Sequence, residues 1–325
     1  MNPVHRFFIV GGAGFIGSHF TDHLLADPAI VSVKLYDNFS SGREWHYESH
    51  RNDSRLTVIR GDAKDLESLT KAMEGSEAVI HLASNPDIAR AATEPDIDFR
   101  EGTCLTNNVL EAMRRSGILN ILYASGSGVY GDLGLTTAAE DYGPLLPIST
   151  YGASKLAGEA LIASYCHMFD FSGNAFRFGN VVGPRQTHGV GFDFLRQLLK
   201  SSNKLKVLGD GTQSKSYIHV DDVVSAVLLA QARSSNRFTV YNVATGDHIS
   251  VAEIAELAME TLGLQPDQVQ IEYTGGNRGW KGDVPVVRLN TDRIQSLGWV
   301  CRSGSREALR KSLLSMLKDM DAGRL

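Results

Sequence analysis

A tyrosine and a lysine four residues apart are the side chains in this sequence best placed to do chemistry together. Tyr151 and Lys155 lie in the run YGASK, and residues four apart on a helix share one face. Because an ammonium stabilises a phenolate, we expect Lys155 to lower the pKa of the Tyr151 phenol from about 10 towards neutrality. Such a phenol can take a proton from a sugar hydroxyl while hydride leaves the same carbon. The spacing alone is also common on solvated helix faces, so its meaning depends on what else the chain binds.

A glycine-rich segment near the start of the chain has the spacing of a dinucleotide-binding loop. It reads GGAGFIG over residues 11–17, after a strand-like run and before a helical one. The first glycine permits a tight turn, the second lets the backbone approach a pyrophosphate, and the third lets the helix pack closely on the strand. The helix N-terminus then offers N–H groups to the phosphates. The predicted contacts of this loop are Gly11, Gly14, Phe15, Ile16 and Gly17.

An acidic residue completes the dinucleotide signature. Asp37 comes 20 residues after Gly17, at the end of the second strand-like run. A carboxylate there accepts hydrogen bonds from the adenosine ribose and repels a 2′-phosphate. The alternative role of Asp37 is that of a turn residue before Asn38. Together with the glycine loop, Asp37 predicts NAD rather than NADP as the cofactor.

Short apolar runs alternate with segments of helical period through the first half of the chain. The strand-like runs are Phe7–Val10, Val33–Tyr36, Leu56–Ile59, Ala78–Leu82, Ile118–Ala124 and Ala175–Phe178. The helical segments are Phe15–Leu25, Leu66–Met73, Phe99–Arg115 and Tyr151–Phe169. This alternation predicts an α/β fold with a doubly wound parallel sheet of the Rossmann type, covered by helices on both faces.

The second half has a different pattern. Val181–Gly191 is rich in glycine and polar residues and is predicted to be a loop. Helices are predicted at Phe192–Lys200, Val223–Ala232, Val251–Leu262 and Glu307–Leu317, and strands at Leu205–Leu208, Phe238–Tyr241 and Val269–Glu272. We therefore predict an NAD-binding domain over residues 1–180. Residues 181–325 are predicted to form mainly a smaller C-terminal substrate-binding lobe, with segments that return to the sheet.

The composition is that of an ordinary globular protein, with 42% hydrophobic and 21% charged residues. The net charge of −5 and the scattered lysines and arginines argue against nucleic acid or a membrane surface as the main partner. Three widely spaced cysteines indicate neither a disulfide framework nor a zinc site, and favour a reducing, cytoplasmic setting. The run HVDD at 219–222 is assigned to helix capping, and no metal is expected.

These motifs, with others along nearly the whole chain, make the sequence resemble the extended short-chain dehydrogenase/reductases. The resemblance is to the nucleotide-sugar epimerase/dehydratase branch typified by UDP-glucose 4-epimerase. The further landmarks are YDNFSSG at 36–42, RGDAKD at 60–65, HLASNPD at 81–87, SGSGVYG at 125–131, RFGNVVGPR at 177–185, KSYIHVDDV at 215–223 and GWKGDVP at 279–285.

The resemblance implies roles for further residues. The additional cofactor contacts would be Asn38, Ser41, Gly42, Asp62, Ala63, Leu82, Ala83 and Ser84. Tyr151 and Lys155 would also contact the cofactor, with Lys155 holding the nicotinamide ribose. Asn180 would meet the diphosphate of the substrate, and Asp283 the ribose of its nucleotide. Lys215 stands where the family usually has an arginine for that diphosphate, so the charge is kept but the bidentate fork is lost. Arg278 is a second candidate phosphate contact, although the family's arginine usually lies nearer to the aspartate.

The sequence departs from the family where a serine or threonine usually hydrogen-bonds the reacting hydroxyl. Gly126 stands there, between Ser125 and Ser127. Either serine or a water could replace the missing hydroxyl, with Ser127 slightly favoured, and a weakened or altered reaction is an alternative. The acidic pair that the family's 4,6-dehydratases carry is absent, because Ser127 and Gly128 fill those positions.

The resemblance therefore implies an NAD-dependent 4-epimerase of UDP-glucose or UDP-N-acetylglucosamine that works through a transient 4-keto sugar. Val287, where relatives that exclude N-acetyl sugars tend to carry a bulkier residue, leaves room for the N-acetyl group or is simply a strand residue. The alternatives are a uronic acid epimerase, a ketoreductase, or a non-catalytic nucleotide-sugar binder. A homodimer is also implied, paired through the helices over Phe99–Arg115 and Tyr151–Phe169.

Overall fold

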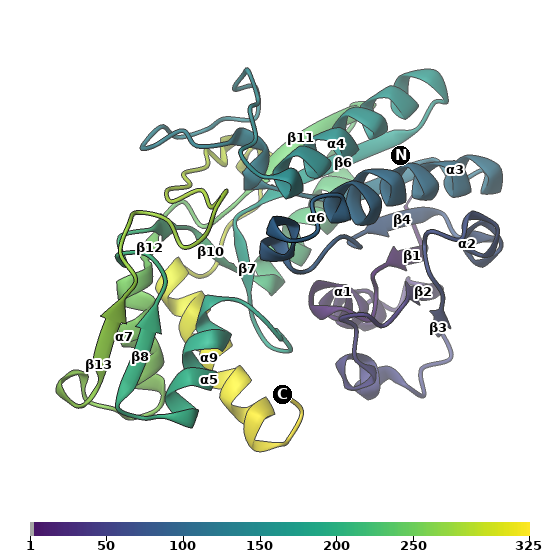
Figure 1. The fold of residues 1–325 in the computed structure, drawn as a ribbon. Coiled ribbons are helices and arrows are strands. Elements are labelled where there is room, and N and C mark those ends of the chain that lie inside the picture. Colours follow the sequence, from purple (N-terminus) through teal and green to yellow (C-terminus); the bar gives the residue numbers. More distant parts are fainter. Residues whose placement is uncertain (1–2) are drawn as a thin grey trace.

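Seven parallel strands form the central sheet of the computed structural model, which describes residues 3–325 (Figure 1). The strand order is β11-β6-β5-β4-β1-β2-β3. Their bounds are β1 Arg6–Val10, β2 Ser32–Asp37, β3 Leu56–Arg60, β4 Ala78–His81, β5 Asn120–Gly126, β6 Ser172–Phe178 and β11 Phe238–Val243. The order reverses between β1 and β4, and in such open sheets ligands bind at the carboxyl ends of the strands beside this reversal. The predicted doubly wound fold is confirmed.

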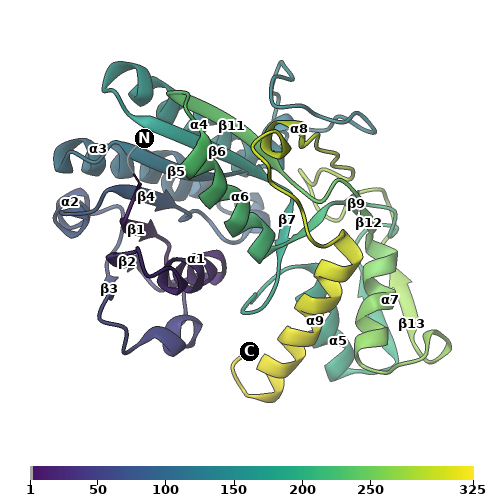
Figure 2. The same ribbon diagram turned by 180° about the vertical axis from the view of Figure 1, so that it is seen from behind.

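Helices cover both faces of the sheet. On one face lie α2 (Leu66–Met73), α3 (Leu105–Ser116) and α4 (Thr150–Met168); on the other lie α1 (Phe15–Ala26) and α6 (Val220–Arg233), as Figures 1 and 2 show. Each face has its own apolar core, which explains why β1 and β4 are almost wholly buried apolar runs. Within residues 3–325, no helix has the length and apolar character needed to cross a membrane.

The C-terminal lobe packs around a third apolar core. The short helix α8 (Asp292–Gln295) packs against β11 of the central sheet. The helices of the lobe are α5 (Val190–Lys200), α7 (Val251–Thr261) and α9 (Ser305–Asp321). Three strand pairs join them: β7 (Asn180–Val182) with β10 (Tyr217–His219), β9 (Ser214–Lys215) with β12 (Ile249–Ser250), and β8 (Lys204–Val207) with β13 (Gln270–Tyr273). In Figure 2 the lobe lies beside the sheet, with α9 between α6 and α5. The lobe therefore stands over the carboxyl ends of the central strands.

Two elements differ from the sequence predictions. The predicted loop over 181–191 is partly wrong, because β7 occupies Asn180–Val182 and α5 begins at Val190. A three-residue strand is too short to show a period, and β7 exists only because β10 pairs with it. The predicted helix over Phe99–Arg115 begins as a π-helical turn, Phe99–Cys104, before α3. Short 3₁₀ helices occupy the connections at Glu44–His50, Ile88–Ala92, Ser127–Tyr130 and Pro266–Gln268.

Candidate active site

A cavity of about 1280 Å³ lies between the carboxyl ends of the sheet strands and the C-terminal lobe. Nearly all the residues singled out from the sequence line it. They are Gly11, Gly14, Phe15, Ile16, Gly17, Asp37, Asn38, Ser41, Asp62, Ala63, Leu82, Ala83, Ser84, Ser125, Ser127, Tyr151, Lys155, Asn180, Lys215 and Asp283. Gly42 and Arg278 do not line it, although their chain neighbours Ser41 and Gly279 do. Residues up to 272 positions apart in the sequence, from Gly11 to Asp283, thus converge on one space.

The backbone of the glycine loop faces the cavity without side chains of its own glycines in the way. Gly11 has a φ of +81°, and a Cβ there would lie 2.9 Å from the backbone nitrogen of Ala83. The helix α1 begins at Phe15 after Gly14, and no side chain caps its N-terminus. The first-turn N–H groups therefore remain available to an anion. This arrangement fits the pyrophosphate of a dinucleotide.

Asp37 holds the glycine loop as well as facing the cavity. Its Oδ2 accepts a hydrogen bond from the backbone N–H of Ala13 at 3.0 Å, and its Oδ1 accepts one from Phe39 at 2.7 Å. Burial raises the pKa of Asp37 in spite of these two bonds. A carboxylate has about four lone-pair sites, so capacity for ribose hydroxyls remains. Gly42 packs behind it, where a Cβ would lie 2.8 Å from Oδ1.

The two serines on either side of Gly126 lie near the end of β5 and at the start of the 3₁₀ helix that follows it. The Ser125 hydroxyl is buried and donates to Oε1 of Glu159 at 2.6 Å, so its proton is already engaged. The Ser127 hydroxyl is half-buried and makes no hydrogen bond within the described part of the chain. A Cβ added at Gly126 would meet no atom within 4 Å. Of the two serines, Ser127 is thus the one free to contact a substrate.

Tyr151 and Lys155 enter the cavity from the first turns of α4. The cap of this helix is Ser149, whose hydroxyl accepts from the N–H of Gly152. Lys155 is buried; its Nζ donates to the carbonyl of Ala124 at 2.8 Å and lies 5.5 Å from the centroid of the Tyr151 ring. The predicted pair is therefore formed.

The pKa of Tyr151 does not follow the sequence-based expectation. Burial raises it to about 12, although a hydrogen bond with Ser84 acts in the opposite direction. The predicted lowering is therefore wrong for the polypeptide by itself, because desolvation disfavours the phenolate and the negative charge of Asp98 disfavours it further. Burial also lowers the pKa of Lys155 to about 8, against the opposing charges of Asp98 and Glu159.

We expect Lys155→Met to make the NAD-free protein more stable at pH 7. The pKa of Lys155 falls from 10.5 in the unfolded chain to about 8 in the folded one, so burying its charge costs about 3 kcal/mol below pH 8. Between about pH 8 and 10.5 the unfolded chain binds more protons, and this cost disappears as pH rises. Urea unfolding at pH 7 and pH 10 should show a gain of about 2–3 kcal/mol that is largely lost at the higher pH.

Each measurement compares the variant with the wild-type protein at the same pH, which removes effects of pH on other groups. Lys64→Met is the matched control, because Lys64 is exposed and forms an ion pair with Glu101 at 2.7 Å. This control should lose a little stability at pH 7. Equal stability differences at the two pH values for Lys155→Met would show that Lys155 titrates normally in the fold.

The lobe supplies a second group of polar side chains to the cavity. Lys215 Nζ donates to Oδ1 of Asp283 at 2.6 Å, and Oδ2 accepts from the N–H of Gly279 at 3.0 Å. Trp280 also lines the cavity, with its ring centroid 5.2 Å from Lys215 Nζ. Arg278 instead donates to Asp132 and to the carbonyl of Asp283. Sequence reasoning missed Trp280, although it lies in the quoted motif GWKGDVP.

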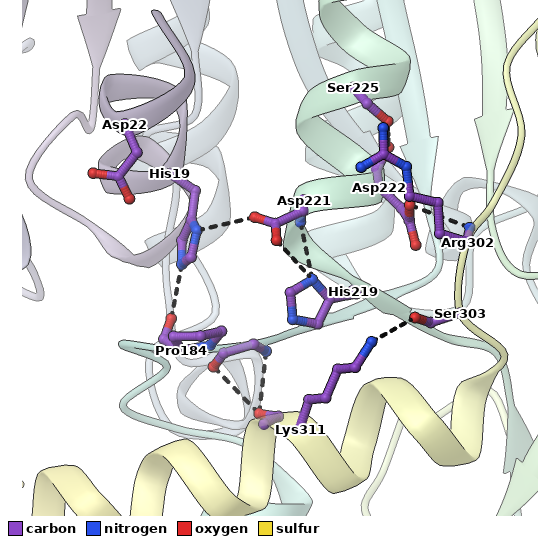
Figure 3. Close-up of polar contacts among 12 residues, drawn as sticks. His19, Asp22, Pro184, His219, Asp221, Asp222, Ser225, Arg302, Ser303 and Lys311 are labelled. Carbon is purple, nitrogen blue, oxygen red and sulfur yellow. Dashed lines mark hydrogen bonds and ion pairs between the residues drawn. The ribbon is translucent and has the colours of Figure 1, made fainter. Parts of the chain in front are cut away.

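The HVDD run joins the two parts of the chain. His219 is the N-cap of α6, and its Nδ1 accepts from the N–H of Asp221. Figure 3 shows Asp221 between His219 and His19 of α1. Hydrogen bonds from His19 and His23 hold the pKa of Asp221 well below its usual range. Residues 219–222 thus cap a helix and tie it to the helix that follows the glycine loop.

Comparisons with known proteins agree with this geometry. The profile of the NAD-dependent epimerase/dehydratase family matches residues 7–244. A UDP-glucose 4-epimerase of Mycolicibacterium smegmatis is 31% identical over 95% of this chain and 97% of its own. A crystal structure of a UDP-galactose 4-epimerase is 35% identical over 97% of this chain and 99% of its own, with a TM-score of 0.86. MoeE5 in complex with UDP-glucuronic acid and NAD is 30% identical over the same shares, with a TM-score of 0.84.

The family is enzymatic, and its members use NAD. The glycine loop, Asp37 and the cavity fit that cofactor, and the pair on α4 lies on the same cavity. The chain belongs to the NAD-dependent epimerase/dehydratase family of nucleotide-sugar enzymes, within the extended short-chain dehydrogenase/reductases.

Proposed function

We propose that this enzyme epimerises a nucleotide-activated sugar at C4, and that its substrate is UDP-glucose or UDP-N-acetylglucosamine. The observation that carries the proposal is the set of groups around the Tyr151 phenol. Lys155 and the free hydroxyl of Ser127 lie on the same cavity, and residues 127 and 128 provide no carboxylate. This set can move a proton on and off a hydroxyl, but Ser127 and Gly128 replace the acidic pair that would assist the removal of water.

The side chains have separate tasks in this reaction. Tyr151 takes the proton from the sugar hydroxyl and later returns it to the same oxygen. Lys155 supplies positive charge beside the phenol and would hold the nicotinamide ribose. Ser127 would hydrogen-bond the reacting oxygen and keep it in line with Tyr151. NAD, when bound, supplies the hydride acceptor and a positive ring whose charge favours the phenolate form.

The second group of polar side chains would hold the nucleotide. Lys215 would pair with the diphosphate, Asp283 would accept from the ribose hydroxyls, and Asn180 would add a contact to the phosphates. Because Lys215 and Asp283 pair at 2.6 Å in the polypeptide alone, a substrate phosphate would share the lysine with the aspartate. Arg278 is a weaker candidate for this task, since Asp132 holds its guanidinium.

The part of the cavity wall near Gly126 and Val287 supports this choice of substrate. No atom lies within 4 Å of the position of a Cβ at Gly126, and Val287 is a modest, half-buried part of the wall. Both features leave room for an N-acetyl group. MoeE5 binds UDP-glucuronic acid, so a uronic acid epimerase is the second candidate, and ketoreduction is the third.

Purified protein should interconvert UDP-glucose and UDP-galactose, or their N-acetylated counterparts, without added NAD. Each nucleotide sugar of a panel, including UDP-glucuronic acid and GDP- and dTDP-sugars, is incubated alone, with NAD, and with NADH or NADPH. Products are separated by chromatography. An epimerase regenerates its cofactor and needs no added reductant, whereas turnover that depends on NADH or NADPH would contradict the proposal and identify a ketoreductase.

A homodimer through α3 and α4 belongs to the same proposal. Phe99, Met168 and Phe169 are apolar residues at the ends of the π-helical turn and α4, and all three are exposed in the single chain. Covering these residues with a partner subunit would stabilise the dimer, because removing apolar surface from water is favourable.

A further inference from the structure

A buried carboxylate on α4 lies on the same helix face as the two predicted catalytic residues. Glu159 follows Lys155 by four residues and Tyr151 by eight, so all three point towards the sheet. Its side chain is only 5% exposed, and its partner Arg177 is 3% exposed. Arg177 donates to both oxygens, from Nε to Oε1 at 3.0 Å and from Nη2 to Oε2 at 2.7 Å. A doubly bonded ion pair therefore lies directly behind the reactive face of α4.

This ion pair is attached to β5, the strand that leads directly to Ser127. The Ser125 hydroxyl donates to Oε1 of Glu159 at 2.6 Å, and Arg177 on β6 stands opposite Ser125 in the strand register. One residue earlier, the carbonyl of Ala124 accepts from Lys155 Nζ at 2.8 Å. Two successive residues of β5 are thus tied to two successive turns of α4.

We propose that Glu159, held by its two hydrogen bonds from Arg177, is a positioning residue that fixes the end of β5 against α4. It thereby sets the Ser127 hydroxyl relative to Tyr151 and keeps a negative charge one helical turn from Lys155. This inference rests on the proposed function only where its test measures kcat, because the NAD-binding test needs no turnover. Glu159 itself touches neither substrate nor cofactor in this arrangement, because Ser125 and Arg177 take up its oxygens.

The charge of Glu159 acts on a lysine that several elements surround. The titratable and charged groups facing Lys155 are Asp98 from the π-helical turn, Tyr151 and Glu159 from α4, Tyr123 from β5 and His81 from β4. Of these groups, only Asp98 and Glu159 are carboxyl groups, and the charge of each raises the pKa of Lys155 and so favours its ammonium form. Removing Glu159 therefore removes one of two charges that keep Lys155 protonated.

Two variants separate the positioning effect of Glu159 on β5 from the effect of its charge on Lys155. Ser125→Ala cuts the tie without changing charge, and should lower kcat about tenfold while leaving KM and the pH profile close to wild type. The double variant Glu159→Gln with Arg177→Gln removes both charges together. It avoids the strongly destabilising unpaired arginine that Glu159→Gln alone would leave. In the double variant, the fall of kcat at alkaline pH should begin at lower pH.

The decisive readout does not need turnover. NAD is titrated into NAD-stripped wild-type and double-variant protein from pH 7 to 9.5 by calorimetry. Because protonated Lys155 would hold the nicotinamide ribose, affinity should fall as it loses its proton. Around pH 8.5 the double variant should bind NAD about three- to tenfold more weakly than wild type, with a smaller difference at pH 7.

The outcomes distinguish this inference from the proposed function. Unchanged pH profiles for kcat and NAD binding in the double variant, together with a lower melting temperature, would show that the ion pair is only structural and overturn the inference. Wild-type protein without turnover on any nucleotide sugar would contradict the proposed function. If the alkaline loss of NAD affinity nevertheless began at a lower pH in the double variant than in wild type, the role of Glu159 would stand.

Discussion

We expect Tyr151→Phe to lower kcat for epimerisation at least about 1000-fold while NAD stays bound. The substitution deletes one oxygen and keeps the ring, so the packing of α4 and its cap at Ser149 should survive. Without the phenol, the proton of the sugar hydroxyl has no acceptor on the cavity wall at that position. Ser127 cannot replace it, because a serine hydroxyl is a weak base without a partner to take its proton. The change is measured as initial rates with saturating nucleotide sugar, and bound NAD is measured from the absorbance of the purified protein.

Tyr165→Phe is the control in the same helix. The Tyr165 hydroxyl donates to Oε1 of Glu111 at 2.6 Å, on the far part of α4 from the cavity. Its loss should cost about 1.5–3 kcal/mol of stability, as for a hydrogen bond to a charged group, and leave kcat within about twofold. Turnover retained in Tyr151→Phe would remove the tyrosine from the mechanism. Nucleotide-sugar binding without turnover in both wild type and Tyr151→Phe would instead identify a binder.

The fold was predictable because its signals are local and repeated. The run Phe7–Val10 is apolar throughout, as a strand buried on both faces must be, and the glycines after it announce the turn to α1. The position of Asp37 was also predictable, because it directly follows the strand-like run Val33–Tyr36 and therefore stands at the end of a strand. The strand β7 was missed because its three residues gain their structure from β10, which lies 35 residues later in the chain.

The residues around Tyr151 show what the sequence could not supply. Ser125 and Ser127 look equivalent on either side of Gly126, and only the fold shows that Glu159 takes one hydroxyl and leaves the other free. The spacing of Tyr151, Lys155 and Glu159 was a usable signal for that carboxylate. The pKa of Tyr151 was mispredicted because a sequence shows the neighbouring charge but not the depth of burial. Which side chains compete for a partner is therefore a property of the packed structure.

Gly17→Ala should abolish tight NAD binding and destabilise the fold. A Cβ at Gly17 would lie 2.6 Å from the carbonyl oxygen of Gly12 and 2.7 Å from that of Gly11. Both are backbone atoms of the loop, so the clash can be relieved only by moving α1 away from the end of β1. That shift would misalign the first-turn N–H groups with the phosphates. We expect the affinity for NAD to fall at least about 100-fold, equivalent to ~2.7 kcal/mol, and stability without NAD to fall by about 1–3 kcal/mol.

The rise in melting temperature on adding NAD measures this effect, because a ligand that binds only the folded protein stabilises it according to its affinity. Ser18→Ala is the matched control: Ser18 is fully buried in the same turn, and its hydroxyl donates to the carbonyl of Phe15 at 2.7 Å. This control adds no atom against the loop, so it should keep NAD affinity within about threefold. An undiminished NAD response in Gly17→Ala would mean that the phosphates bind elsewhere, since the loop cannot keep its shape around an added methyl group.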